Sequence, residues 1–179
     1  MAEPRFIFRS CAGKMEDIVM TRKWILLAED NPHDAELAIR ALGGKASSDT
    51  VILARDGEEV LNCLYRRSEF SSHDETHPTL VLLDLKMPKV DGLEVLRQIK
   101  SDSRLKAIPV VMFTSSREQS DLIQTYGLGA NAYVVKPLVF QHFMTTIKDI
   151  KRFWMTINEP PPEAILEHES RCNQLTGAA

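Results

Sequence analysis

LVLLDLKMPKVDG, residues 80–92, is the stretch of this chain that decides its fold. Four apolar residues lead directly to one carboxylate, Asp84, and the run then breaks at Pro88 and Gly92. A continuous apolar run is typical of a strand that is buried on both faces, as parallel sheets require. A carboxylate at the mouth of such a strand is costly to keep charged, unless it has partners or does chemistry.

Short apolar runs of this kind recur along the chain. They are WILLA (24–28), TVIL (50–53), TLVLL (79–83), PVVMF (109–113) and AYVV (132–135). Longer segments with helical periodicity separate them, so the pattern is a strand and a helix repeated five times. With right-handed crossovers this alternation predicts an α/β fold, a doubly wound five-stranded parallel sheet in a single domain.

The expected helices carry start signals. In NPHDAELAIRAL, Asn31 suits the N-cap, Pro32 the first helical position and Asp34 the first turn. DGEEVLNCLYRR (56–67) and DGLEVLRQIK (91–100) each place Glu three residues after Asp, which follows the logic of a capping box. Asp-Gly also occurs in hairpins, but helix-periodic residues follow both copies, and we therefore favour helices.

The last helix is expected to begin after Lys136-Pro137. Its apolar positions advance by three or four residues and are Val139, Phe143, Ile147, Ile150, Trp154 and Ile157. We therefore divide the chain into a loose N-terminal extension (1–21), the domain itself (22–157) and a Pro-rich tail (158–179) that is too short for an effector domain.

Composition excludes several functional classes. The net charge of −3 and the pI near 6.0 provide no basic field for nucleic acid or an anionic membrane. No apolar run approaches the roughly 18 residues of a membrane span. Three scattered cysteines, Cys11, Cys63 and Cys172, indicate free thiols in a reducing cytoplasm. His73 and His77 suggest a metal site, but a solvated loop over 66–78 explains them better because no Cys or third His accompanies them.

Polar residues follow the expected strands. In open parallel sheets the reactive groups gather at the carboxyl ends of the strands, near the point where strand order reverses. This rule brings together Glu29 and Asp30, Asp84, Thr114 and Lys136. Taken singly, each has an ordinary structural explanation, such as a helix cap or a solvated charge, so the hypothesis depends on their joint placement.

The group suits phosphoryl transfer onto a carboxylate. Clustered acids repel one another, and a hard divalent cation such as Mg²⁺ relieves that repulsion. Asp84, central among the acids, is the expected nucleophile and would form an aspartyl phosphate. Lys136 can bind one phosphoryl oxygen, and the Thr114 hydroxyl can donate a hydrogen bond to another.

Four motifs in order resemble the receiver domain of two-component response regulators. They are LAEDN (27–31), LLDLKMPKVDG (82–92), VMFTSS (111–116) and AYVVKP (132–137), and the resemblance spans roughly residues 23–157. The intervals also match: Thr114, Tyr133 and Lys136 lie 30, 49 and 52 residues after Asp84.

The resemblance implies a role for each matching residue. Asp84 is the phosphoacceptor for a histidine kinase, and Asp30 and Asp84 bind Mg²⁺ with the main-chain carbonyl of Lys86. Glu29, where the family commonly has aspartate, is expected to act through water. A further implication is a cis peptide bond between Lys136 and Pro137.

Signalling is also implied by the resemblance. Thr114 and Tyr133 correspond to the switch pair, in which the hydroxyl moves toward the phosphate and the ring turns inward. The fourth helix, fifth strand and fifth helix form the expected dimerisation or docking surface. The opening ILLAEDNPHDAEL and the terminal FWMTI are similar to the single-domain regulators of cyanobacterial and bacterial phytochromes. Such a protein is a phosphoacceptor and not an enzyme acting on a separate substrate.

Three rival hypotheses remain for comparison. A haloacid-dehalogenase-like phosphatase would need D-x-D, whereas Leu85 and Lys86 follow Asp84. A flavin or nucleotide binder would need a glycine loop early in a βα unit, whereas GLGA (127–130) precedes the last strand and is typical of a helix end. A pseudo-receiver that docks partners without phosphate fits the same fold, and Asp30, Asp84, Thr114 and Lys136 argue against it.

Overall fold

The structure is a computed structural model that describes residues 23–43, 51–67 and 77–161. Its elements are β1 (Ile25–Ala28), α1 (Pro32–Leu42), β2 (Val51–Ala54), α2 (Gly57–Leu64), β3 (Leu80–Leu83), α3 (Gly92–Ser101), β4 (Val110–Thr114), α4 (Gln119–Gly127), β5 (Ala132–Val135), α5 (Phe140–Arg152) and a π-helical turn η3 (Phe153–Ile157). Each predicted apolar run overlaps one strand, with bounds that differ by at most one residue.

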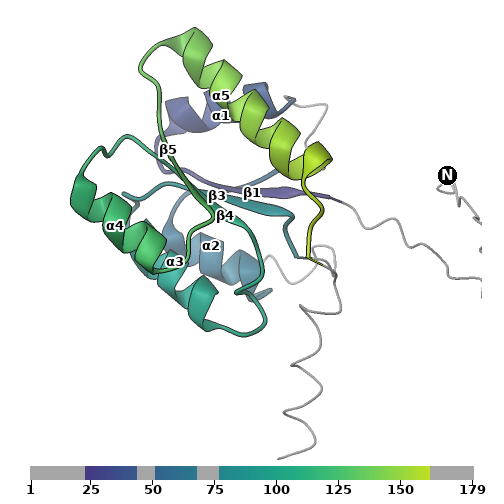
Figure 1. Ribbon diagram of the computed structural model, residues 1–179, viewed down its shortest axis with the longest axis vertical. Helices are drawn as coiled ribbons and strands as arrows, with labels where there is room; N and C mark the ends of the chain where they lie inside the picture. Colours follow the sequence, from purple (N-terminus) through teal and green to yellow (C-terminus); the bar gives the residue numbers. More distant parts are fainter. Residues whose placement is uncertain (1–22, 44–50, 68–76, 162–179) are drawn as a thin grey trace, which may run out of the picture.

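The five strands form one parallel sheet in the order β2-β1-β3-β4-β5. Helices α1 and α5 cover one face, and α2, α3 and α4 cover the other (Figure 1). Strand order reverses between β1 and β3, so the carboxyl ends of these two strands flank the switch point. The prediction of a doubly wound parallel sheet is confirmed.

Alternate residues of the strands feed two separate cores. Leu26, Ala28 and Leu83 point toward α2 and α3, whereas Ile25 and Leu27 point toward α1 and α5. The rings of Phe113 and Phe143 meet edge to face, with their centroids 5.2 Å apart, and anchor α5 on the second core. Burial on both faces explains why these strands appear as unbroken apolar runs in the sequence.

Predicted caps begin the first three helices. The Asn31 side chain accepts hydrogen bonds from the backbone N–H groups of His33 and Asp34 at 2.9 and 3.4 Å. Asp56 and Asp91 each accept from the residue three positions on, at 2.8 Å in both cases. In the first predicted capping box, Glu59 accepts from the backbone N–H of Arg55 at 2.7 Å. Arg55 lies one residue before the N-cap Asp56, whose own N–H a standard capping box would use.

The C-terminal helix departs from its prediction. Phe143, Ile147 and Ile150 are buried as expected, but Val139 is 54% exposed as the N-cap and Ile157 is 57% exposed. The α-helix ends at Arg152, and the N–H of Asn158 donates to the Phe153 carbonyl at 2.7 Å. Since that i→i+5 bond widens the turn, Ile157 rotates away from the core face that the 3.6-residue period assigned to it.

Several predictions fall outside the described residues. They are the loose extension at 1–21, Cys11, Cys172, His73, the central part of the 66–78 loop and the tail from residue 162. Cys63 is a free, buried thiol, and burial raises its pKa to about 11. Within the described ranges, no helix has both the length and the apolar character that crossing a bilayer requires.

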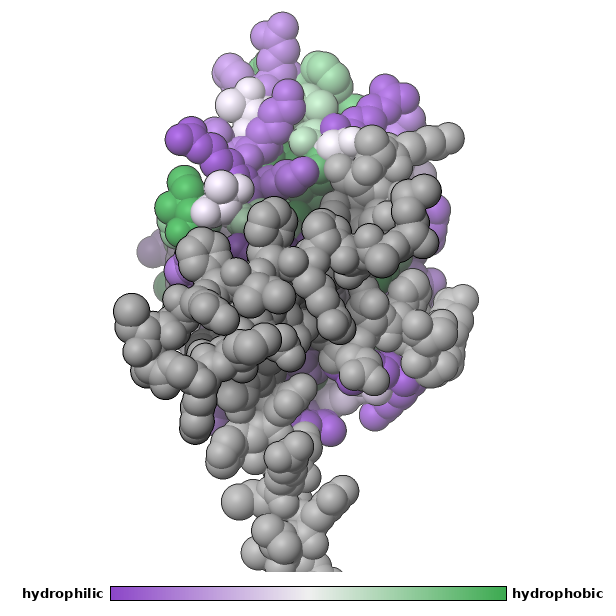
Figure 2. All heavy atoms as spheres, turned by 90° about the vertical axis from the view of Figure 1, so that its right-hand side faces the viewer, coloured by the Kyte–Doolittle hydropathy of each residue, from purple (hydrophilic) through white to green (hydrophobic). Residues whose placement is uncertain are grey.

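Figure 2 views the molecule from the end at which the strands begin. Its upper part, over the layer of α1 and α5, shows hydrophilic side chains with apolar ones between them. The polar residues that follow the strands lie at the opposite end.

Candidate functional site

Asp84 follows β3 at the carboxyl edge of the sheet, and its backbone N–H donates to the Ala28 carbonyl at 3.0 Å. Its carboxylate Oδ1 accepts from the N–H groups of Leu85 and Lys86 at 2.6 and 3.4 Å. Oδ2 accepts from Lys136 Nζ at 2.6 Å. These donors satisfy a carboxylate that is almost fully buried, and they fix its orientation.

Gly92 explains why the run that delivers Asp84 must end in glycine. A Cβ at this position would lie 2.1 Å from the Asp84 carbonyl oxygen and 2.8 Å from Leu85 Cα. The Gly92 N–H also donates to the Leu85 carbonyl at 2.8 Å. The start of α3 therefore packs directly on the backbone of the acidic residue, and any side chain would push the two apart.

Lys89 anchors the loop between β3 and α3 through ion pairs with residues at the start of α2. This residue has a φ of 61°, a left-handed conformation that is uncommon for a residue with a side chain. Its ammonium lies 2.8 Å from Asp56 and 3.1 Å from Glu58. The loop after β3 is thus tied to the start of α2.

Three acids converge at the switch point. Carboxylate oxygens of Glu29, Asp30 and Asp84 lie within 4.8 Å of one another. Glu29 is buried, whereas Asp30 is exposed. Burial raises the pKa of Glu29 to about 7, although a hydrogen bond from Lys136 acts in the opposite direction.

Lys136 reaches into this group from the end of β5. Its ammonium lies 2.5 Å from Glu29 Oε2, 2.6 Å from Asp84 Oδ2 and 3.2 Å from Asp34 Oδ2. Burial alone would lower its pKa, but the hydrogen bonds to Asp84 and Glu29 outweigh that effect and the pKa is raised. Glu29, Asp30, Asp84 and Lys136 are called the acid–lysine cluster below.

The cluster has the chemistry of a divalent metal site. Three carboxylates at the ends of neighbouring strands offer hard oxygen ligands, and their like charges repel until a cation lies among them. Lys136 supplies only one positive charge to this group. The predicted ligands Glu29, Asp30 and Asp84 are brought together, while the part played by the Lys86 carbonyl stays a prediction.

Thr114 and Tyr133 lie beside the cluster on β4 and β5. Thr114 is fully buried, and its backbone carbonyl accepts from the Lys136 N–H at 2.8 Å. Its hydroxyl oxygen accepts from the Ser116 N–H at 3.2 Å. The half-buried Tyr133 donates its hydroxyl to the Ser116 carbonyl at 3.1 Å, so one residue contacts both members of the predicted pair.

The expected cis bond before Pro137 is wrong, because no peptide bond among the described residues is cis. The trans form is favoured by about 0.5–1 kcal/mol before proline, and the chain adopts it here. Lys136 still reaches Asp84, so the trans bond does not prevent assembly of the cluster.

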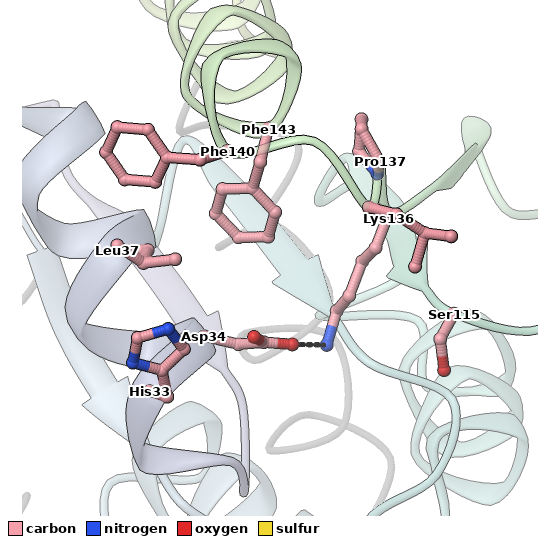
Figure 3. A pocket seen from close by; sticks show the side chains of 9 residues that line it. His33, Asp34, Leu37, Ser115, Lys136, Pro137, Phe140 and Phe143 are labelled. Atoms are coloured by element: carbon pink, nitrogen blue, oxygen red, sulfur yellow. Dashed lines mark hydrogen bonds and ion pairs between the residues drawn. The ribbon is translucent and has the colours of Figure 1, made fainter.

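Asp34 is the site residue that sequence reasoning missed. It was assigned only to the first turn of α1, yet it contacts Lys136 across 102 positions of sequence. Its place four residues after Asp30, on the helix that leaves the carboxyl end of β1, was the available clue. A pocket of about 270 Å³ lies beside this contact, lined by His33, Ser115 and an apolar group from the start of α5 (Figure 3).

Comparison with known proteins identifies the family. Residues 25–148 match the model of the response regulator receiver domain. FilR2 of Methanothrix harundinacea, described as a probable methanogenesis regulatory protein, is 42% identical over 78% of this chain and 88% of its own length. Response regulator Rcp1 of Synechocystis is 36% identical over 79% of this chain and 95% of its own.

Solved structures agree with that match. The phosphorylated cyanobacterial phytochrome response regulator RcpA has a TM-score of 0.73 and 37% identity, and covers 79% of this chain and all of its own. The Mn²⁺-bound form of Rcp1 has a TM-score of 0.71 and 35% identity, over 78% of this chain and 99% of its own.

Proposed function

The chain belongs to the response regulator receiver family and is close to phytochrome response regulators, and on that premise we propose that Asp84 is its phosphoacceptor. The observation that carries the proposal is the convergence of Glu29, Asp30 and Lys136 on the Asp84 carboxylate. The protein is then a phosphorelay component that receives its phosphoryl group from a histidine kinase, the partner that the family implies.

The transfer needs few protein groups. An oxygen of Asp84 attacks phosphorus, the bond from phosphorus to the donor imidazole breaks, and the imidazole nitrogen keeps the electron pair. Lys136 binds a phosphoryl oxygen and Thr114 donates its hydroxyl to another, so positioning and electrostatics account for the rate. Mg²⁺, held by Asp30, Asp84 and the Lys86 carbonyl with Glu29 acting through water, would neutralise charge on the transferring oxygens.

The switch is proposed to act through the loop that follows β4. If Thr114 turns its hydroxyl toward a phosphoryl oxygen, it loses its bond from the Ser116 N–H. The Ser116 carbonyl accepts a hydrogen bond from the Tyr133 hydroxyl. The Ser116 hydroxyl donates to Asp121 on α4 at 2.6 Å. A phosphoryl group brings about −1.5 to −2 charge, which is enough to bias a segment with two balanced arrangements.

The surface that transmits the switch is proposed to be α4, β5 and α5, with a second copy of the chain as partner. Leu122, Ile123 and Tyr126 are exposed on α4 and form the α4 face. Phe153 and Ile157 are exposed on η3, the π-helical turn that follows α5. The apolar residues grouped on α4 favour a protein interface at that helix. Phosphorylation should reduce the elution volume in size-exclusion chromatography, and Ile123→Glu should abolish that change.

The cognate kinase is proposed to be a phytochrome. Support comes from the likeness to RcpA, which is itself a phytochrome response regulator. The receiver unit is taken as residues 22–157, flanked by the extension and the tail. Phosphotransfer assays against candidate phytochrome kinases and unrelated histidine kinases would test this choice of partner, and faster transfer from an unrelated kinase would contradict it.

Acetyl phosphate with Mg²⁺ tests the acceptor directly. The protein should gain the mass of one phosphoryl group, and EDTA should prevent that gain. Asp84→Asn should not be labelled, whereas Asp149→Asn, an exposed aspartate on α5, should be labelled normally. Absence of labelling in the folded parent would favour the pseudo-receiver, and labelling of Asp84→Asn would place the acceptor elsewhere.

A further inference from the structure

Three carboxylates share the Lys136 ammonium, and they are not equivalent. The side chains of Glu29, Asp84 and Asp34 are 3%, 8% and 28% exposed, respectively. The contact with Asp34 is also the longest, at 3.2 Å. Asp34 is therefore the carboxylate that binds the Lys136 ammonium most weakly, and it is the most exposed of the three to solvent.

Removal of Asp34 would leave Lys136 held in place. Glu29 and Asp84 keep their hydrogen bonds of 2.5 and 2.6 Å, and the lysine stem remains packed at the end of β5. An ammonium has three N–H donors, and here the third goes to Asp34. Asp34 thus competes with any phosphoryl oxygen that needs this donor.

Asp34 also sets the charge of the pocket beside the cluster. Figure 3 shows its carboxylate directed at the Lys136 ammonium, with His33 next to it and Phe140 and Phe143 on the far wall. Among the described residues that line this pocket, Asp34 is the one carboxylate and Lys136 the one primary amine. A small anionic donor that approaches Lys136 through the pocket meets the charge of Asp34 first.

Resting on Asp84 as the proposed acceptor, we propose that Asp34 determines donor specificity by weakening the binding of free dianionic phosphodonors. It occupies the third N–H of Lys136, and it repels a small acyl phosphate that enters from solvent. A phosphohistidine on a docked kinase suffers less from this repulsion, because its binding free energy comes largely from protein contacts remote from the phosphoryl group. Asp34 then favours delivery by a protein over delivery by metabolites.

The test compares Asp34→Asn with Asp34→Glu in the full chain, with acetyl phosphate as the donor and saturating Mg²⁺. Asp34→Asn should lower the KM for acetyl phosphate about three- to tenfold, the size expected for one partly exposed charge, and leave the maximal rate within about twofold. Asp34→Glu should restore the parent KM. Glu36→Gln, which removes an exposed carboxylate from the same helix, should behave as the parent does.

Two further measurements separate charge from structure. The change in KM should shrink at high salt and for phosphoramidate, which carries less negative charge than acetyl phosphate. An unchanged or higher KM in Asp34→Asn, or a Glu variant that behaves like Asn, would overturn the proposal. Labelling that survives Asp84→Asn would instead refute the proposed acceptor, whatever the Asp34 variants show.

Discussion

The acid–lysine cluster and the α4 face lie in the same small domain but are built differently. Around the cluster, β3 is buried along its whole length and α1, α2 and α3 each begin with a side-chain cap. On the other side, β5 is only half-buried, and neither α4 nor α5 has a side-chain cap. The chemistry is placed where the fold is rigid, and the proposed output surface is placed where movement costs less free energy.

The largest effect should come from the centre of the cluster. Lys136→Met leaves Glu29 and Asp84 buried without a cation, which should lower the free energy of unfolding by about 3–5 kcal/mol in EDTA. Urea denaturation at pH 7 measures this, and Mg²⁺ should restore part of the loss. Lys148→Met, at an exposed position of α5, should stay within about 0.5 kcal/mol of the parent. Equal losses in the two variants would contradict the rigid-cluster account.

Gly92→Ala should be nearly as damaging, because the new methyl group would collide with the Asp84 backbone. We expect a loss of about 3 kcal/mol in the free energy of unfolding, at the upper end of overpacking effects. Gly127→Ala is the matched control on α4, since a Cβ there meets nothing within 4 Å. That variant should be neutral or up to about 1 kcal/mol more stable. A larger loss of stability in Gly127→Ala than in Gly92→Ala would mean that the loop after β3 can shift to accommodate the new methyl group.

Lys100 on α3 contacts the segments that precede β4 and β5, and it should make stability depend on pH. Its ammonium donates to the carbonyls of Lys106 and Ile108 and to the Asn131 side chain at 3.1, 2.8 and 3.1 Å. Burial lowers its pKa to about 8, against an ordinary value of 10.5. Between these two pH values the unfolded chain binds more protons than the folded chain does, so stability should rise with pH.

The expected rise is about 1–2 kcal/mol between pH 8 and 10.5, because solvent screens a side chain that is not fully buried. The difference in unfolding free energy between the parent and Lys100→Met isolates this contribution from other groups that titrate in the same range. If the difference in unfolding free energy does not change with pH, the three carbonyl acceptors fully compensate the cost of burying the Lys100 ammonium.

The smallest effect should come from the caps. Asp91→Ala removes the bond from the Glu94 N–H and should cost about 1 kcal/mol of unfolding free energy. Glu118→Ala at the start of α4 removes no cap bond and should change stability by less than about 0.5 kcal/mol. Thermal denaturation of both variants compares them directly. A larger loss at Glu118 would remove the contrast between the two regions.

The sequence was sufficient for features that depend on local pattern and topology. Five apolar runs predicted the five strands, because burial on both faces leaves no polar alternation to misread. The rule for strand ends then brought Glu29, Asp30, Asp84 and Lys136 to one edge without any coordinates.

Features that depend on distant contacts or exact backbone geometry were not predictable. The ion pair between Asp34 and Lys136 requires the relative position of α1 and β5, which no local pattern contains. The role of Gly92 depends on a backbone packing so close that a Cβ there would lie 2.1 Å from the Asp84 carbonyl oxygen. The turn at Phe153 depends on one i→i+5 bond. Periodicity assigns faces correctly only while the helix keeps its 3.6-residue turn.

Chemical mapping of the phosphorylated residue tests the central proposal most directly. After incubation with acetyl phosphate and Mg²⁺, borohydride reduces an aspartyl phosphate to homoserine, and peptide mass spectrometry locates it in the sequence. We predict homoserine at position 84 alone. Homoserine at position 30 or at any other aspartate, with Asp84 intact, would contradict the account.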